Sequence, residues 1–89
     1  MFEFDKSKSG SNKEKHGIDF ETAKKLWEDP NRIEIPARWL DEPRYILIAL
    51  LNESLWSAIY TVSNKKIRII SVQKSRNDEK EIYDSLGIR

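Results

Sequence analysis

The feature that most constrains the fold is a series of strand-like segments between residues 32 and 72, joined by short connections. The first segment alternates apolar and polar residues, and the next three are rich in apolar, β-branched and aromatic residues. The segments are RIEIP (32–36), RYILIALL (44–51), LWSAIYTVS (55–63) and KIRIISV (66–72). Because NES and NK leave room only for tight turns, the strands are expected to form an antiparallel meander.

Two helices are predicted before these strands. Asp5 is a suitable N-cap for a helix that ends at His16, with Gly17 as its C-terminal stop. Asp19 caps a second helix, whose apolar residues recur at helical spacing until Pro30 ends it.

A third helix is predicted in the tail that follows the last strand. Ser75 and Asp78 have the spacing of a capping box, and Gly87 fits the position after the last turn. The segments together predict one α+β domain, residues 1–89, with two N-terminal helices, a four-stranded antiparallel sheet and a C-terminal helix, the helices packed on one face. FEF (2–4) also fits a short N-terminal edge strand.

Composition excludes several classes of protein. Without cysteine and with a single histidine among 89 residues, the chain has neither a disulfide scaffold nor a cysteine or multi-histidine metal site, and no cofactor is expected. No apolar run is long enough to span a membrane, and the N-terminus lacks the apolar region of a signal peptide, so a cytoplasmic location is expected. The net charge is only +1, so contacts with nucleic acid require locally clustered cations.

A set of short motifs, in a fixed order, carries a resemblance to a known family. The motifs are FEFD, N…KHGIDFETA, EDP, an arginine before an apolar strand, YT, KIRIIS and E…Y in the last helix. From Phe2 to about Leu86, the chain resembles the BrnT family, the toxin half of a bacterial type II toxin–antitoxin pair.

This resemblance implies a RelE-like fold and a metal-independent ribonuclease that inhibits translation. It also implies a BrnA-like antitoxin, encoded beside the toxin, that neutralises it and connects the complex to promoter DNA. After IIS the family usually has alanine and two arginines, whereas this chain has Val72, Gln73 and Lys74. The alternative function is therefore a weakened or inactive domain that mainly binds the antitoxin and supports promoter autorepression.

Cleavage without metal requires a base for the ribose 2′-hydroxyl, cations for the transition-state phosphate and an acid for the leaving oxygen. His16 and Glu79 are candidate bases, and Tyr83 is a candidate proton donor or stacking group. The phosphate-binding candidates are Arg44, Arg68, Lys74 and Arg76.

Lys15 and Trp39 complete the candidates for RNA contact, and Trp39 is alternatively an anchor for the antitoxin. Each candidate also has a purely structural interpretation. His16 suits a helix C-terminus, Glu79 suits a first helical turn, and Tyr83 suits a core. Arg44 and Arg68 would equally suit solvated strand positions.

Overall fold

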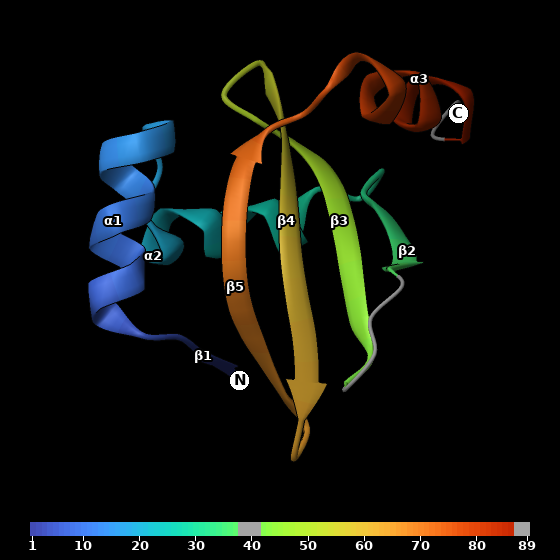
Figure 1. Cartoon of the computed structure of the whole chain (residues 1–89). Helices are drawn as coiled ribbons and strands as arrows, with labels where there is room; N and C mark the ends of the chain where they lie inside the picture. Colours follow the sequence, from blue (N-terminus) through green and yellow to red (C-terminus); the bar gives the residue numbers. More distant parts are fainter. Residues whose placement is uncertain (38–41, 87–89) are drawn as a thin grey trace.

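The computed structural model describes residues 1–37 and 42–86, so Trp39 and Gly87 lie outside the described residues. Five strands form one sheet with the order β1-β5-β4-β3-β2 (Figure 1). The α+β class is confirmed. The elements are β1 (Phe2–Glu3), α1 (Lys6–His16), α2 (Phe20–Ala23), the 3-10 helix η1 (Lys24–Glu28), β2 (Ile33–Ala37), β3 (Arg44–Leu51), β4 (Ser54–Ser63), β5 (Lys66–Lys74) and α3 (Asn77–Leu86).

Strands β2 to β5 form the predicted antiparallel meander. Its two tight turns, Asn52–Glu53 and Asn64–Lys65, hold all four residues at positive φ, between 50° and 70°. This left-handed conformation matches the twist of paired strands, which is why two-residue hairpin turns use it. β2 is an edge strand, where Pro36 is tolerated because proline has no amide hydrogen to donate. β5 continues two residues past its predicted end.

The sheet is mixed, so the expectation of four antiparallel strands was incomplete. The N-terminal strand β1 exists, and it pairs parallel with β5, with Phe2 opposite Ile67. The amide of Ile67 donates to the carbonyl oxygen of Met1 at 2.8 Å. A parallel pairing requires a long connection, and here most of the chain separates the two strands.

The first helix agrees with its prediction. The Asp5 carboxylate accepts hydrogen bonds from the amides of Ser7 and Lys8 at 2.8 and 3.1 Å. Gly17, at a φ of 85°, closes the last turn by donating to Lys13. Helix α1 therefore begins and ends where its two capping residues place it.

The second helix is shorter than predicted, since α2 gives way to the 3-10 helix η1 after Ala23. The predicted apolar residues are nevertheless buried, because Phe20, Ala23 and Leu26 are at most 1% exposed. Tighter 3-10 turns are common where a helix ends, and here Pro30 follows shortly. The change from α-helix to 3-10 helix therefore alters the local geometry, but the apolar side chains of this segment remain buried.

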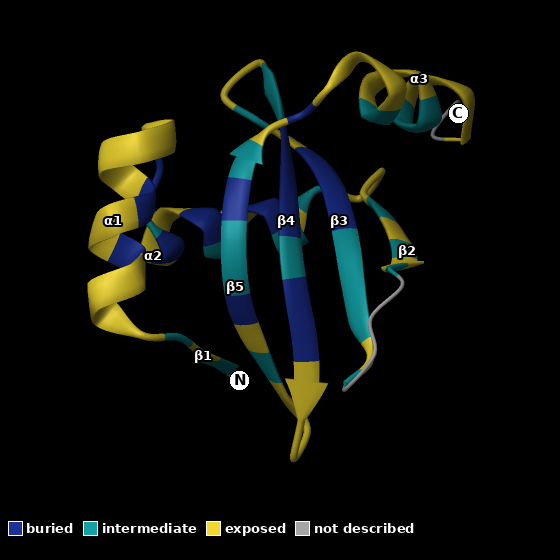
Figure 2. Ribbon diagram, in the orientation of Figure 1, coloured by how far each residue is buried: buried dark blue, intermediate teal, exposed yellow. Residues whose placement is uncertain are grey.

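The predicted position and cap of the last helix were wrong. Helices α1, α2 and η1 pack beside or against the face that carries the core cluster (Figures 1 and 2). The start of α3 instead lies on the opposite face, where Glu79 accepts a hydrogen bond from Ser57 of β4 at 2.9 Å. Ser75 does not cap the helix, because its hydroxyl is bonded to that of Ser57 at 2.7 Å. Glu79 accepts from the amide of Arg76 at 2.8 Å, which is half of a capping box one residue later.

Asp29 connects three parts of the fold. Its carboxylate accepts hydrogen bonds from the amides of Asn31 and Leu50 and from the hydroxyl of Tyr83, each at 2.8 Å. Burial alone would raise the pKa of Asp29, but these hydrogen bonds outweigh it and lower the pKa below 3.8.

Asp29→Asn is therefore expected to destabilise the protein by about 1–2 kcal/mol at pH 7, because it weakens charge-assisted hydrogen bonds. A carboxylate with a lowered pKa stabilises the fold above its unfolded pKa, and this contribution is lost as pH falls through the folded pKa. The difference between wild type and variant in urea unfolding should thus shrink below about pH 4. A difference that is constant from pH 7 to pH 3 would contradict this assignment.

Candidate functional site

The sheet has a second face, opposite the core cluster, on which the candidates Arg44 and Arg68 lie. Side chains alternate between the two faces of a strand, and the core cluster takes Leu47 and Ala49 of β3 and Ala58 and Tyr60 of β4. The intervening residues therefore point to the other side, which we call the open face. Cross-strand pairing arranges them in three rows: Thr61 and Arg68; Ile46, Ile59 and Ser71; and Ile48, Ser57 and Gln73. Arg44 lies two residues before Ile46 on β3, so the alternation puts it on the same face at the end of the first row.

A β-bulge at Ile70 makes this arrangement possible. Tyr60 pairs with Ile69 and Ile59 pairs with Ser71, so Ile70 is left without a partner. The extra residue shifts the alternation, and Ile69 and Val72 are both buried in the core. Gln73 is consequently on the open face, in the same row as Ser57.

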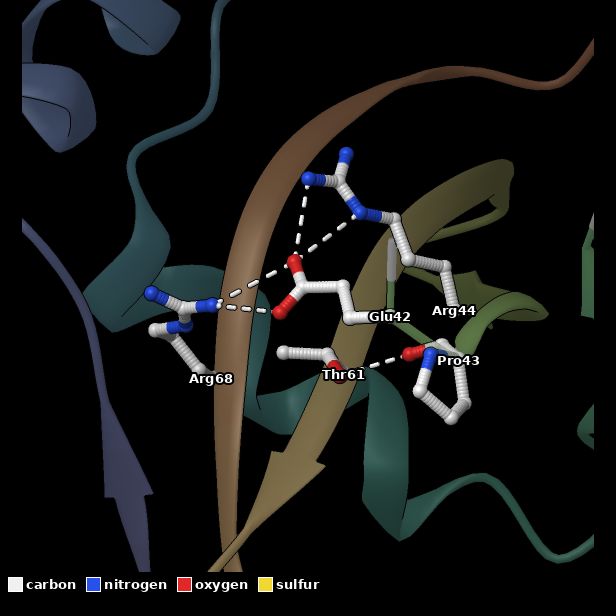
Figure 3. Close-up of polar contacts among 5 residues, drawn as sticks. All are labelled: Glu42, Pro43, Arg44, Thr61 and Arg68. Atoms are coloured by element: carbon white, nitrogen blue, oxygen red, sulfur yellow. Dashed lines mark hydrogen bonds and ion pairs between the residues drawn. The ribbon is translucent and has the colours of Figure 1, made fainter. Parts of the chain in front are cut away.

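Arg44 and Arg68, the two arginines of the first row, both contact the Glu42 carboxylate (Figure 3). Glu42 accepts from Nε and Nη2 of Arg44 at 3.2 and 3.0 Å, and from Nη2 of Arg68 at 3.2 and 3.4 Å. The Thr61 hydroxyl donates to the carbonyl oxygen of Pro43 at 2.6 Å, which fixes the start of β3 beside β4. Two predicted phosphate ligands thus share a single anionic partner, and both guanidinium groups remain partly exposed.

His16 and Lys15 lie in a neighbouring hollow between α1 and β5. This hollow has a volume of about 210 Å³ and is lined by exposed side chains of α1, among them Lys8, together with Ile70 and Ser71. Lys8 and Ile70 also line the hollow of about 170 Å³ that contains Arg44 and Arg68. The two hollows therefore adjoin at Lys8 and Ile70, with the histidine in one and the arginine pair in the other.

Arg76 and Glu79 lie in a third hollow, at the start of α3. Its volume is about 220 Å³, with the side chains of Ile46 and Ile59 among its lining and Gln73 on its wall. Ser71 lines this hollow and the one that contains His16. The three hollows thus follow one another along β5. Together we call them the β5 groove, and six basic residues line it. They are Lys8, Lys15, His16, Arg44, Arg68 and Arg76.

Two further candidates lie away from the groove, and one is not described. The Lys74 ammonium lies 5.7 Å from the centroid of the Trp56 ring, on the core side of the sheet. The Tyr83 hydroxyl donates to Asp29 at 2.8 Å. Trp39 lies outside the described residues.

The two residues of the YT motif, Tyr60 and Thr61, point to opposite faces of the sheet. Thr61 faces the open side, whereas Tyr60 is buried in the core and donates to Glu34. Burial raises the pKa of Tyr60 strongly, and the hydrogen bond to the Glu34 carboxylate raises it further. Tyr60 is therefore a structural donor at neutral pH.

Sequence reasoning missed Glu42 and Lys8 as components of the site. The spacing of Glu42 and Arg44 was a usable signal, because residues two apart on an extended segment share one side. Nothing in the order of residues shows that Arg68 joins this pair, since that depends on the register between strands. Lys8 is one of several lysines on α1, and only the packing of α1 against β5 distinguishes it.

Comparison with known families gives an independent result. The family model described as ribonuclease toxin, BrnT, of type II toxin–antitoxin system matches residues 4–79. No curated protein matches the chain. Among the described residues, no helix is long and apolar enough to cross a membrane. Since the match spans most of the 89 residues and includes every element from α1 to β5, the chain belongs to the BrnT family of ribonuclease toxins of type II toxin–antitoxin systems.

Proposed function

We propose that the chain is an endoribonuclease that cuts RNA without a metal ion in the β5 groove and thereby inhibits translation. The convergence of Arg44 and Arg68 on one carboxylate carries this proposal. A phosphodiester has the same single negative charge as a carboxylate, and guanidinium groups bind both in the same forked geometry. The Glu42 carboxylate thus occupies a position suited to an RNA phosphate.

Exchange of Glu42 for a phosphate is energetically reasonable. Exposed ion pairs contribute only about 0–1 kcal/mol each, and here both arginines stay partly accessible to solvent. An RNA phosphate that replaces Glu42 regains the same two pairs. The arginines are then placed to stabilise the additional negative charge of the transition state.

His16 is the proposed general base. It is exposed at the end of α1, and its hollow adjoins the arginine pair through Lys8 and Ile70. In this scheme the imidazole takes the proton of a ribose 2′-hydroxyl, the 2′-oxygen bonds to the adjacent phosphorus, and the bond to the 5′-oxygen breaks as that oxygen receives a proton. Glu79 is less suited to this role, because its carboxylate is already bonded to Ser57 and to the amide of Arg76.

The remaining parts of the proposal rest on family membership. We propose a RelE-like relationship for the fold, a cytoplasmic site of action, and neutralisation by a BrnA-like antitoxin. Contact with promoter DNA would occur through that antitoxin.

A second candidate function is a binding module with little or no cleavage activity. The position of Lys74 favours it, because this lysine lies over Trp56 rather than in the groove. Gln73 is uncharged, so the end of β5 contributes no cation to the groove. In this version the chain mainly binds the antitoxin and supports autorepression.

Purified protein is expected to cut a mixed RNA in the presence of EDTA, as followed by gel electrophoresis. Products should carry a 5′-hydroxyl, because the 2′-oxygen is the nucleophile. Intact RNA at a large excess of protein, with the antitoxin still bound tightly in a pull-down, would favour the binding module.

A further inference from the structure

The third hollow of the β5 groove has the chemistry of a binding site for one flat ring. Ile46 and Ile59 supply apolar surface, and polar side chains surround them. Its volume of about 220 Å³ is smaller than the roughly 300–1,000 Å³ of pockets that hold whole drug-sized ligands. It therefore suits one heterocycle of a longer ligand rather than a complete small molecule.

Three polar side chains in this hollow have no hydrogen-bond partner among the residues that the structure describes. They are the Ser71 hydroxyl, the Gln73 amide and the Arg76 guanidinium. Gln73 is half-buried, and a partly desolvated amide without a partner is costly unless a ligand or water satisfies it. Ser57 and Glu79, by contrast, are bonded to each other and to the start of α3.

The position of the hollow relates it to the arginine pair. Its isoleucines form the row next to the one that holds Arg44 and Arg68. Adjacent rows on one face are two residues apart, which is about 7 Å along a strand. A phosphate at the arginines and a base in the hollow would thus belong to the same or neighbouring nucleotides.

We propose that this hollow binds one unpaired nucleobase of RNA and that Gln73 reads its edge, with adenine preferred. The proposal rests on the proposed function, since it assumes that RNA lies in the β5 groove. A glutamine amide offers one acceptor and two donors, which match the amino group and ring nitrogen of adenine as a bidentate pair. Proteins recognise single-stranded RNA through such exposed base edges and contacts to the ring face.

Binding of short oligonucleotides tests this assignment without requiring cleavage. The probes are four single-stranded oligonucleotides that share a uridine-like background and differ only in one central base. They lack 2′-hydroxyls, so the protein can bind them without cutting them. Wild-type protein should bind the adenine member about tenfold more tightly than the others, the effect of one good bidentate pair. Gln73→Ala should remove the preference, and Gln73→Arg should transfer it to guanine, because arginine pairs with two acceptors of that base.

Gln73→Lys is the matched control, because it adds the same charge without the planar fork of arginine. It should tighten binding of the whole set and favour guanine less than Gln73→Arg does, because a single ammonium lacks that fork. Equal affinity of wild type for all four bases, or variants that leave the preference unchanged, would overturn the assignment to Gln73, even if cleavage is observed. Altered antitoxin affinity with no base preference would assign the hollow to the protein partner and also overturn it. A protein that neither binds nor cuts RNA would instead refute the proposed function itself.

Discussion

Replacing Arg68 by alanine is expected to slow RNA cleavage by about 10²-fold or more, and Arg44→Ala should have an effect of similar size. This is the magnitude found when one preorganised donor to a developing anion is removed. Both guanidinium groups bind the Glu42 carboxylate, so each is already oriented toward an anion before RNA arrives. Arg68 is the more exposed of the two, which leaves it more accessible to a phosphate.

Stability should change little in Arg68→Ala, because the ion pair of this exposed side chain is worth about 0–1 kcal/mol. Arg32→Ala is the matched control. Arg32 forms a similar pair with Glu34 at 3.2 Å, beside the edge strand β2 and outside the groove-lining residues. Cleavage rates in EDTA, together with circular dichroism, separate the cases. Full activity in both groove variants, or an equal loss in Arg32→Ala, would show that the arginine pair is not the phosphate site.

The sequence predicted the parts of the fold that depend on local signals. Asp5 and Gly17 specify the ends of α1 through their own capping preferences, and NK specifies a turn through its length. The same reasoning named Arg44 and Arg68 as candidate phosphate ligands, and the structure brings both to Glu42. Their common contact with Glu42 depends on strand register, which local patterns do not contain.

The bulge at Ile70 shows why other parts of the site were not predicted. KIRIISV was interpreted as a regular strand, and strict alternation from Ile69 would have placed Ser71 and Gln73 in the core. The two adjacent isoleucines, Ile69 and Ile70, give no local sign that one of them is inserted. Burial of Val72 and exposure of Gln73 to the groove are decided by packing against β4 and α1.

Asn12 illustrates a different limit, because it belongs to the motif that carries the family resemblance but received no role from the sequence. It is 7% exposed on α1, and its amide is bonded to both backbone groups of Val72. Those bonds are 2.8 and 3.1 Å long, and a third runs to the carbonyl oxygen of Ile18 at 2.8 Å. β1 pairs with β5 only near Ile67, so at Val72 the side chain of Asn12 takes the place of a neighbouring strand.

Asn12→Ala is therefore expected to destabilise the protein by about 3–5 kcal/mol, the largest stability effect of any single change proposed for this chain. The substitution leaves buried backbone groups without partners, and each such group costs about 1–3 kcal/mol. For a domain of this size the melting temperature should fall by roughly 12–40 °C. Helix propensity alone predicts the opposite sign, because alanine favours a helix more than asparagine does by up to about 0.7 kcal/mol.

Lys13→Ala, at the exposed neighbouring position of the same helix, controls for helix propensity and should change stability by less than about 1 kcal/mol, because the gain in propensity offsets the loss of a cation in the last turn. Calorimetry and urea unfolding measure both variants. If Asn12→Ala melted at the wild-type temperature, water would have to satisfy the edge of β5, and α1 would not be held there by this side chain. A large loss confined to Asn12→Ala would instead show that this side chain holds α1 at the edge of β5, and with it the hollow that Lys8, Lys15 and His16 line.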